Sequence, residues 1–359
     1  MSRRRSGGLT VNARFLTQRL TGVQRYAIEV SRRLKAMRPD IRFVAPAGII
    51  HTAIARELAV ETVGRLHGHA WEQLELPRYL DGTGLINLCN AAPLAVNRQI
   101  VTIHDAAPFA VPEAYSRTFT LWYRVMTRRL GARAAGIVTV SHFSAGELCR
   151  YLGVAPERID VTPLGSEHVH TIPADEAIIG RHALGDRPFL LAVGSHSPHK
   201  NFTALVRAAE RLGDVPFRFV MAGGADPRVH ASVPEALASG NVVHVGGVSD
   251  AELYALYGRA AGYVHPAYYE GFGLPPLEAM ALGCPVLTSR AASLPEVCGD
   301  AAEYFDPFDG DTIAAAIRRF MADDIRRADL RGVGRTRAGK FSWDGCAQAL
   351  LAIADTRLS

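Results

Sequence analysis

The chain has 359 residues, of which 48% are hydrophobic and 21% are charged, a balance typical of globular proteins. The length favours two domains of about 150–200 residues each. The sequence has no run of about 18 apolar residues that could span a membrane, and the basic N-terminus lacks a signal-peptide core, so we expect a cytoplasmic protein.

The five cysteines are scattered without a CxxC pair, which argues against a disulfide framework and against a zinc site. A net charge of +5 is compatible with nucleic acid, anionic lipid or phosphorylated substrates. Nucleic acid is the least favoured of these, because the positive charges are dispersed and no nucleic-acid-binding motif occurs.

Short apolar runs alternate with helical stretches along the chain. The first group of expected strands comprises residues 9–12, 41–45, 84–88, 100–104 and 137–141; the second comprises 189–194, 217–223, 242–245, 262–265 and 285–289. Runs that are apolar on both faces and alternate with helices predict two doubly wound α/β domains with parallel sheets of Rossmann type.

The polar stretch 163–186 contains proline and glycine and predicts a domain boundary near residue 170. The expected domains are therefore 1–170 and 171–341. We expect a C-terminal helix within 342–359 to pack back on the first domain. Ligands of such folds bind at the carboxyl ends of the strands.

Two positions in the first half of the chain are candidate ligand contacts, Gly22 at the start of a helix and His104 at the end of a strand. Gly22 opens a helix and lets backbone amides approach a phosphate or a sugar, although a tight loop without a ligand is the alternative. His104 ends the strand 100–104, where it can donate a hydrogen bond to a phosphate or a sugar hydroxyl. A structural histidine bonded to the backbone is the other interpretation.

Residues 117–133 mix aromatic and aliphatic side chains with five arginines, which are Arg117, Arg124, Arg128, Arg129 and Arg133. As a helix, this segment either lies on an anionic bilayer, at the inner face of the membrane, or packs Trp122, Tyr123 and Met126 into the core. The arginines would be in solvent in the second case.

Two segments of the second half combine a strand, a glycine turn and a helix. In 189–201, Lys200 precedes a helix and adds a full charge to its positive end, which suits a diphosphate, although a lone loop lysine is usually solvated. In 265–278, HPAYYEGFGLPPLE, Glu270 and Glu278 flank a glycine turn whose amides suit a phosphate, and carboxylates accept hydrogen bonds from sugar hydroxyls. The alternative is an ordinary turn with two solvated glutamates.

These segments together resemble glycosyltransferase family 4, whose GT-B fold has two Rossmann-like domains facing a central cleft. The matching pieces occur in the family's order: TGVQRY (21–26), TIHD (102–105), TVSHFS (139–144), VGSHSPHKN (193–201), EGFGLPPLEAMALGCPVLTS (270–289), LPEVCGDAA (294–302) and FSWD (341–344). WEQLELPR (71–78) is similar to bacterial members that build surface polysaccharides, often mannosyltransferases.

The resemblance implies a retaining transfer of a sugar from a nucleoside diphosphate to a hydroxyl of a glycan or lipid-linked saccharide. GDP-mannose is the first candidate donor, followed by dTDP-rhamnose or a UDP-sugar. No DxD lies near the expected donor pocket, so we expect no essential metal and no cofactor besides the nucleotide-sugar substrate.

The resemblance also implies residue roles. Glu270 would contact the donor sugar, the amides of Gly271, Phe272, Gly273 and Leu274 would hold sugar and phosphate, and Glu278 would bind the ribose. Lys200 and Ser195 would face the diphosphate, His104 the reaction centre, Gly22 the phosphate and Gln24 the acceptor. The family usually has an arginine where Ser195 and His196 stand here, so His196 or His199 would assist Lys200.

Two other classes of protein stay open. One is a sugar-nucleotide epimerase or phosphorylase of similar architecture. The other is a catalytically silent carbohydrate-binding scaffold on this fold. Slow donor hydrolysis without an acceptor would separate a transferase from a scaffold.

Overall fold

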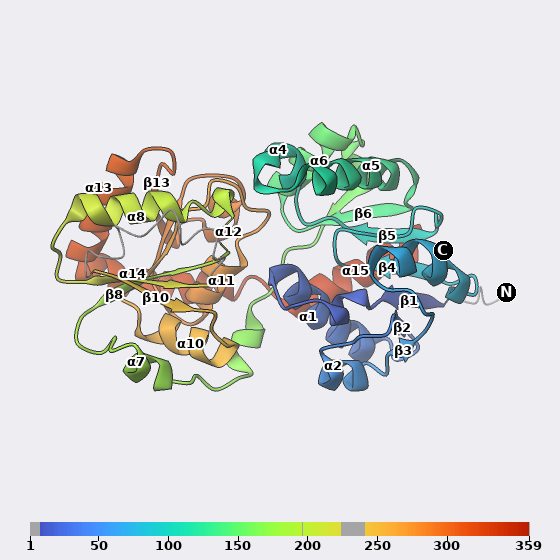
Figure 1. Ribbon diagram of the computed structural model, residues 1–359, viewed down its shortest axis with the longest axis horizontal. Helices are drawn as coiled ribbons and strands as arrows, with labels where there is room; N and C mark the ends of the chain where they lie inside the picture. The colour runs from blue at the N-terminus through green and yellow to red at the C-terminus, as the bar shows by residue number, and fades with distance from the viewer. Residues whose placement is uncertain (1–7, 196, 224–240, 359) are drawn as a thin grey trace. The chain divides into compact units, whose positions relative to one another are not determined.

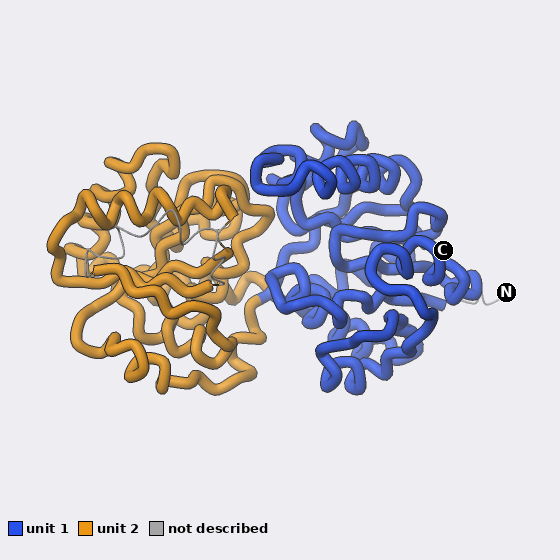
Figure 2. The backbone as a smooth tube through the Cα atoms, viewed as in Figure 1, with its two compact units in different colours: residues 1–165, 342–359 blue, residues 166–341 orange. Residues whose placement is uncertain are grey.

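The computed structural model describes residues 8–195, 197–223 and 241–358, which divide between two compact units (Figure 2). Unit 1 comprises residues 1–165 and 342–359, and unit 2 comprises residues 166–341. The division falls after Gly165 rather than near residue 170, because the short helix η6 (Glu167–His170) is tied into unit 2. His168 Nε2 there donates a hydrogen bond to Glu278 Oε1 at 2.9 Å.

Unit 1 contains a seven-stranded, all-parallel sheet. Its strands in spatial order are β3 (Glu61–Thr62), β2 (Arg42–Ala45), β1 (Leu9–Asn12), β4 (Gly84–Asn87), β5 (Gln99–Thr102), β6 (Gly136–Thr139) and β7 (Ile159–Val161). The residues of β1, β4, β5 and β6 are buried throughout, as expected for strands covered on both faces. Asn12 lies opposite Asn87, so β1 and β4 end at the same level.

The helices of unit 1 are α1 (Gly22–Met37), α2 (Thr52–Glu57), α3 (Gly68–Ala70), α4 (Ala107–Ala110), α5 (Arg117–Arg133), α6 (His142–Leu152) and α15 (Trp343–Arg357). The C-terminal helix α15 packs against α1 (Figure 1). Arg33 of α1 donates to Asp344 at 3.3 Å, and Arg38, which follows the last residue of α1, donates to Asp355 at 2.7 Å. The buried Trp343 ring lies 6.2 Å from that of Tyr26.

Unit 2 contains a six-stranded, all-parallel sheet. Its strands in spatial order are β10 (Val242–Gly246), β9 (Arg218–Ala222), β8 (Phe189–Val193), β11 (Gly262–His265), β12 (Val286–Ser289) and β13 (Ala302–Phe305). Its helices are α7 (Ala177–Arg181), α8 (Phe202–Leu212), α10 (Asp250–Arg259), α11 (Leu274–Ala281), α12 (Leu294–Cys298), α13 (Gly310–Ala322) and α14 (Asp324–Ala338). The prediction of two doubly wound parallel-sheet domains is confirmed.

The core of unit 2 forms where α8 and α13 lie side by side (Figure 1). Leu205 of α8 and Ile313 of α13 are fully buried in one cluster with Phe219 and Leu287 of the sheet. Capping fixes where the helices begin. Asp309 accepts hydrogen bonds from two first-turn amides of α13, and Ser249 forms a capping box with Glu252 at α10.

Candidate active site

The site in unit 2 forms where two adjacent strands end. β8 pairs with β11, so the loops that follow these strands emerge side by side at the carboxyl edge of the sheet. Lys200 ends the short helix η7 (Pro198–Lys200) in the first loop. Asn201 adopts a left-handed conformation (φ 58°), and its side-chain amide donates to the carbonyls of Pro266 at 3.2 Å and Pro307 at 2.8 Å. The bond to Pro266 holds the Lys200 loop against the Glu270 loop, and the bond to Pro307 ties it to the loop after β13.

Lys200 and Glu270, which are 70 positions apart in the sequence, form an ion pair between Nζ and Oε2. The two side chains are only 19% and 15% exposed. Burial opposes the charged form of Glu270, but the Lys200 ammonium and a hydrogen bond from His265 outweigh it and hold the pKa of this carboxyl well below its usual value. Glu270 is therefore a carboxylate at neutral pH.

His265 lies behind this pair at the end of β11. Its Nε2 lies 3.3 Å from Glu270 Oε2, and its Nδ1 lies 2.8 Å from the Tyr263 hydroxyl. Burial lowers the pKa of His265, so the ring is neutral. The carboxylate only accepts, so Nε2 carries the proton and the Tyr263 hydroxyl donates to Nδ1. The result is a directed chain of hydrogen bonds that orients Glu270.

Sequence reasoning missed both His265 and Tyr263. The available signal was the position of His265 at the end of a strand, five residues before Glu270, which is the argument that identified His104. It also missed Ser293, whose hydroxyl donates to the backbone carbonyl of Glu270 at 2.8 Å.

The glycine turn after Glu270 has a geometry that only glycine accepts. Gly273 has φ +100°, and an added Cβ would lie 2.9 Å from Leu294 Cδ2. It caps α11, whose second and third residues, Pro275 and Pro276, have no N–H group. Of the first three residues of α11, Leu274 alone has a backbone N–H that can face a phosphate. The other amides of the expected phosphate site must come from the loop before the helix.

Phe272 and Leu274 are themselves buried, and the Phe272 ring packs edge-on against that of Phe341 at 5.8 Å. Their side chains serve the core, so their expected role as donor ligands rests on backbone atoms alone. The expected roles of Gly271 and Gly273 are likewise backbone roles.

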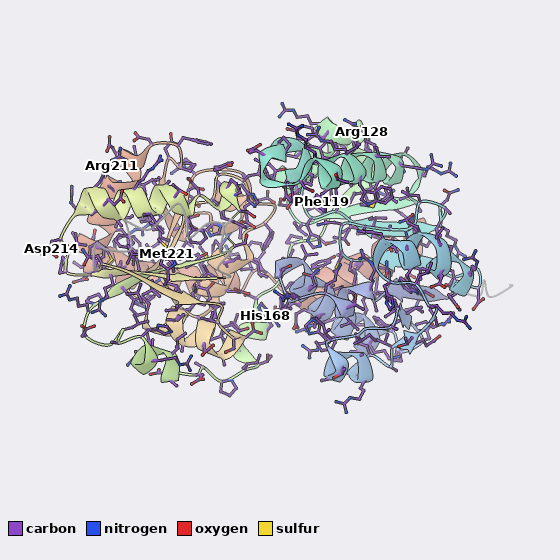
Figure 3. All side chains as sticks on the ribbon, in the orientation of Figure 1. Phe119, Arg128, His168, Arg211, Asp214 and Met221 are labelled. Atoms are coloured by element: carbon purple, nitrogen blue, oxygen red, sulfur yellow. The ribbon has the colours of Figure 1, made fainter. Side chains whose placement is uncertain are left out.

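The remaining expected donor ligands of unit 2 have partners within the unit. Glu278 Oε1 accepts a hydrogen bond from His168 (labelled in Figure 3), and Glu278 is 8% exposed. Ser195 is exposed and its hydroxyl bonds to Ser197 at 3.3 Å. His196 lies outside the described residues, and the carbonyl of the buried His199 accepts from the Tyr268 amide at 3.0 Å. Ribose and diphosphate binding by these residues stays a prediction.

In unit 1, His104 is buried and its ring packs edge-on to Tyr26 at 4.7 Å. Its Nε2 lies 2.9 Å from the Leu88 carbonyl, and because a carbonyl only accepts, Nε2 carries the proton. The structural interpretation of His104 thus accounts for one ring nitrogen. The expectation that the neutral ring donates to a phosphate needs correction, because Nδ1 can only accept, for example from a sugar hydroxyl.

The buried His104 should make the protein less stable as the pH is lowered. Burial lowers the pKa of His104 to about 4 against the hydrogen bond to Leu88, whereas the unfolded chain titrates near 6.5. Between these values the unfolded state binds more protons, so stability is full above pH 6.5 and is lost as the pH falls towards 4. We expect urea denaturation of His104→Gln to show a loss between pH 7 and pH 5 that is smaller than the wild-type loss by about 2 kcal/mol. Identical pH profiles would contradict this assignment.

Gly22 and Gln24 lie at the start of α1. The N-cap Thr21 donates its hydroxyl to Gln24 Oε1 instead of accepting from a helix amide, so the exposed Gly22 opens a helix without a side-chain cap. Gln24 is buried, and its amide group donates to Gln18 Oε1 at 2.9 Å. Phosphate binding at Gly22 is compatible with this geometry, whereas acceptor contact by Gln24 would require these bonds to be exchanged.

In the part of the chain that the structure describes, no three His, Cys, Asp or Glu side chains come together as a metal-binding group. Over the same residues, every helix is too short or too polar to cross a bilayer.

Comparison with known proteins identifies the family. Residues 175–337 match the family model described as Glycosyl transferases group 1, and residues 20–168 match that of Glycosyltransferase Family 4. The chain is 29% identical to O-antigen chain mannosyltransferase B of Escherichia coli over 357 residues, which cover 91% of this chain and 94% of that protein. It is 32% identical to the MMP alpha-(1->4)-mannosyltransferase of Mycolicibacterium hassiacum over 65% of this chain and 57% of that protein.

Among solved structures, Anabaena HepE in complex with UDP and glucose matches with a TM-score of 0.77 at 17% identity, over 96% of this chain and 98% of that chain. Sucrose-phosphate synthase from Thermosynechococcus elongatus matches with a TM-score of 0.75 at 18% identity, over 96% and 98% of the two chains. These similarities show the fold, and the family models together span both units. The chain belongs to Glycosyltransferase Family 4 and is a hexosyltransferase with the two Rossmann-like domains of the GT-B fold.

Proposed function

We propose that this enzyme transfers mannose from GDP-mannose, with retention of configuration, to a hydroxyl of a glycan or lipid-linked saccharide in surface polysaccharide synthesis. The choice of sugar and pathway is supported by the relatives, which are named as O-antigen and other mannosyltransferases. The observation that carries the donor site is the half-buried Lys200–Glu270 pair at the carboxyl edge of the unit 2 sheet.

Electrostatics assigns the roles at this pair. Negative charge develops on the departing diphosphate, and a preorganised ammonium such as Lys200 stabilises it. Glu270, oriented by His265, accepts hydrogen bonds from sugar hydroxyls. Because Lys200 is bound to Glu270 here, a diphosphate that enters must share or replace the carboxylate as the partner of the ammonium.

Retention follows in this proposal from reaction on one face of the sugar. The bond between the anomeric carbon and the phosphate oxygen breaks, the bond to the acceptor oxygen forms on the same face, and the acceptor proton passes to the departing phosphate. No protein nucleophile is then required. His104 of unit 1 would accept a hydrogen bond from a donor hydroxyl through Nδ1, and Gly22 would present amides to the phosphate.

A thermal-shift screen of nucleotides and nucleotide-sugars, run with and without EDTA, tests the donor. A ligand at 100 times its dissociation constant stabilises the folded protein by about 2.7 kcal/mol. We expect GDP and GDP-mannose to raise the melting temperature and GDP-mannose to be hydrolysed slowly to GDP, equally well in EDTA. A shift by UDP or dTDP ligands alone would replace the donor, and loss of turnover in EDTA that Mg²⁺ restores would refute metal independence.

Helix α5 bears on the question of membrane contact. The structure buries Tyr123 and Met126 but leaves Trp122 exposed, so the expectation that all three pack into the core is wrong for Trp122. Leu121 is 67% exposed and Val125 is 52% exposed. The helix has no acidic residue, and two of its side chains, Phe119 and Arg128, are labelled in Figure 3. We propose that the face of α5 that carries Leu121 and Val125 rests on an anionic bilayer, with arginines of the helix near the headgroups.

Vesicle co-sedimentation tests this contact. The wild type should bind phosphatidylglycerol vesicles at low salt and release them at high salt, because salt screens the attraction between the arginines and the headgroups. Arg128→Gln should lower the affinity roughly fivefold, since one basic residue near the surface contributes about 1 kcal/mol. Leu121→Ser/Val125→Ser should weaken binding further. Ile325→Ser, at an 85% exposed apolar position on α14, is the matched control and should bind like the wild type. Equal binding by all variants would remove α5 from the contact.

A further inference from the structure

A second polar constellation, in unit 1, is built around the buried Glu72. Glu72 lies in the π-helix η2 (Trp71–Glu75), and its side chain is only 1% exposed. Its Oε1 accepts from Asn12 Nδ2 at 2.8 Å and from Arg14 Nε at 3.1 Å, and its Oε2 lies 3.1 Å from His69 Nδ1. Asn12 also donates to Asn87 Oδ1 at 3.1 Å. Every oxygen of the carboxylate is thus engaged.

The position of this network in the fold is that of a ligand site. Asn12 and Asn87 are the last residues of the neighbouring strands β1 and β4, so Glu72 lies at the carboxyl edge of the unit 1 sheet. In open α/β sheets, ligands bind at this edge. A structural role alone would explain the Asn12 and Arg14 bonds, but it leaves the half-exposed His69 unexplained.

The buried carboxylate sets the tautomer of the neutral His69 ring. Burial opposes ionisation of Glu72, but the bonds from His69, Arg14 and Asn12 prevail and lower its pKa, so Glu72 is ionised and only accepts. In the neutral imidazole, Nδ1 of His69 therefore carries the proton, and Nε2 can accept a hydrogen bond. The His69 side chain is 45% exposed.

An exposed aromatic ring stands beside this acceptor. The Trp122 ring of α5 lies edge-on to His69, with centroids 6.1 Å apart at 68°. Trp122 is 37% exposed, whereas Trp71 and Trp343 are fully buried. A pyranose offers an apolar face of C–H groups and a ring of hydroxyl donors. A flat indole beside an oriented imidazole acceptor complements both.

We propose that Trp122 and His69 form a subsite for one sugar of the acceptor saccharide, with the sugar stacked on the indole and one hydroxyl donating to His69 Nε2. Glu72 is a positioning residue that sets the tautomer of His69. The assignment of the sugar to the acceptor rests on the proposed transferase function, but the binding of a saccharide to unit 1 does not.

Tryptophan fluorescence tests the subsite without requiring turnover. Trp122 is the exposed member of the three tryptophans, so acrylamide quenching reports mainly on it. The probes are the methyl glycosides of mannose, glucose, galactose, rhamnose and N-acetylglucosamine. At least one should reduce quenching in a saturable way, and Trp122→Phe should abolish the change. His69→Ala should weaken binding at least tenfold, whereas Leu121→Ala, an exposed site on the same helix, should not.

Two results would overturn the subsite. One is the absence of any saturable change with these glycosides. The other is a change with anionic vesicles but none with free glycosides, which would assign Trp122 to lipid contact instead. Failure of the donor screen together with saccharide binding here would refute the proposed transfer but leave the subsite standing.

Steady-state kinetics separates positioning from general structural support. Glu72→Gln can bond to His69 without fixing the same tautomer, so the KM for the acceptor should rise at least fivefold while the KM for the donor stays unchanged. If both KM values and kcat change together, Glu72 supports the fold of unit 1 and does not position His69.

Discussion

Replacing Lys200 by methionine is expected to lower the rate of sugar transfer by about 10²–10³-fold, the usual cost of removing one preorganised group that stabilises developing negative charge. Methionine keeps most of the volume of the side chain and removes only the ammonium. In the free enzyme this ammonium neutralises the Glu270 carboxylate. As the donor bond breaks, it would also neutralise the negative charge that develops on the diphosphate.

The measurement is kcat at saturating donor and acceptor. Lys340→Met is the matched control, because Lys340 is the exposed lysine at the end of α14 and makes no side-chain ion pair among the described residues. Transfer by Lys200→Met at the control rate would remove Lys200 from the mechanism.

The fold should survive the Lys200 change, but with a measurable loss of stability, because among the described residues Glu270 would retain only His265 as a side-chain partner. Glu270→Gln removes that unpaired charge. We therefore expect the double variant Lys200→Met/Glu270→Gln to be more stable than the sum of the two single losses predicts. Strict additivity would show that the pair contributes no coupling energy.

The second large effect is on stability in unit 1. Glu72→Leu should lower the free energy of unfolding of unit 1 by about 3–5 kcal/mol, because it leaves the buried Arg14 guanidinium without its carboxylate and removes one of the two acceptors of the Asn12 amide. Removal of one member of a buried pair costs more than the pair itself contributes, since the remaining charge keeps its desolvation penalty.

Urea denaturation followed by tryptophan emission measures this loss, because all three tryptophans belong to unit 1. Glu61→Leu is the control. Glu61 pairs with Arg42 at 2.8 Å on the surface of the same unit, and such exposed pairs contribute about 0–1 kcal/mol. Similar losses in the two variants would mean that the Glu72 network contributes no more than a surface pair.

The sequence was sufficient wherever the physics is local. Strand burial on both faces gives continuous apolar runs. These runs placed β1 and β11 at their observed bounds and the other eight expected strands within a residue or two. The strands β3, β7 and β13 were missed because each contains a polar residue and is partly or wholly exposed, so none forms a continuous apolar run. Pairing with a neighbouring strand decides their conformation. The left-handed Gly273 and the helix that follows it were likewise local signals.

Side-chain pairing was beyond the sequence, because it depends on which strands become neighbours. The sequence singled out Lys200 and Glu270 separately, but only the pairing of β8 with β11 brings them together and places His265 behind them. The Glu72 network joins segments 58 and 60 positions apart through the alignment of β1 with β4. Local pattern thus determined the parallel sheets and the chemically capable residues. Strand order and register, which are set by the packing of the apolar faces of the whole sheet, decided which of those residues meet.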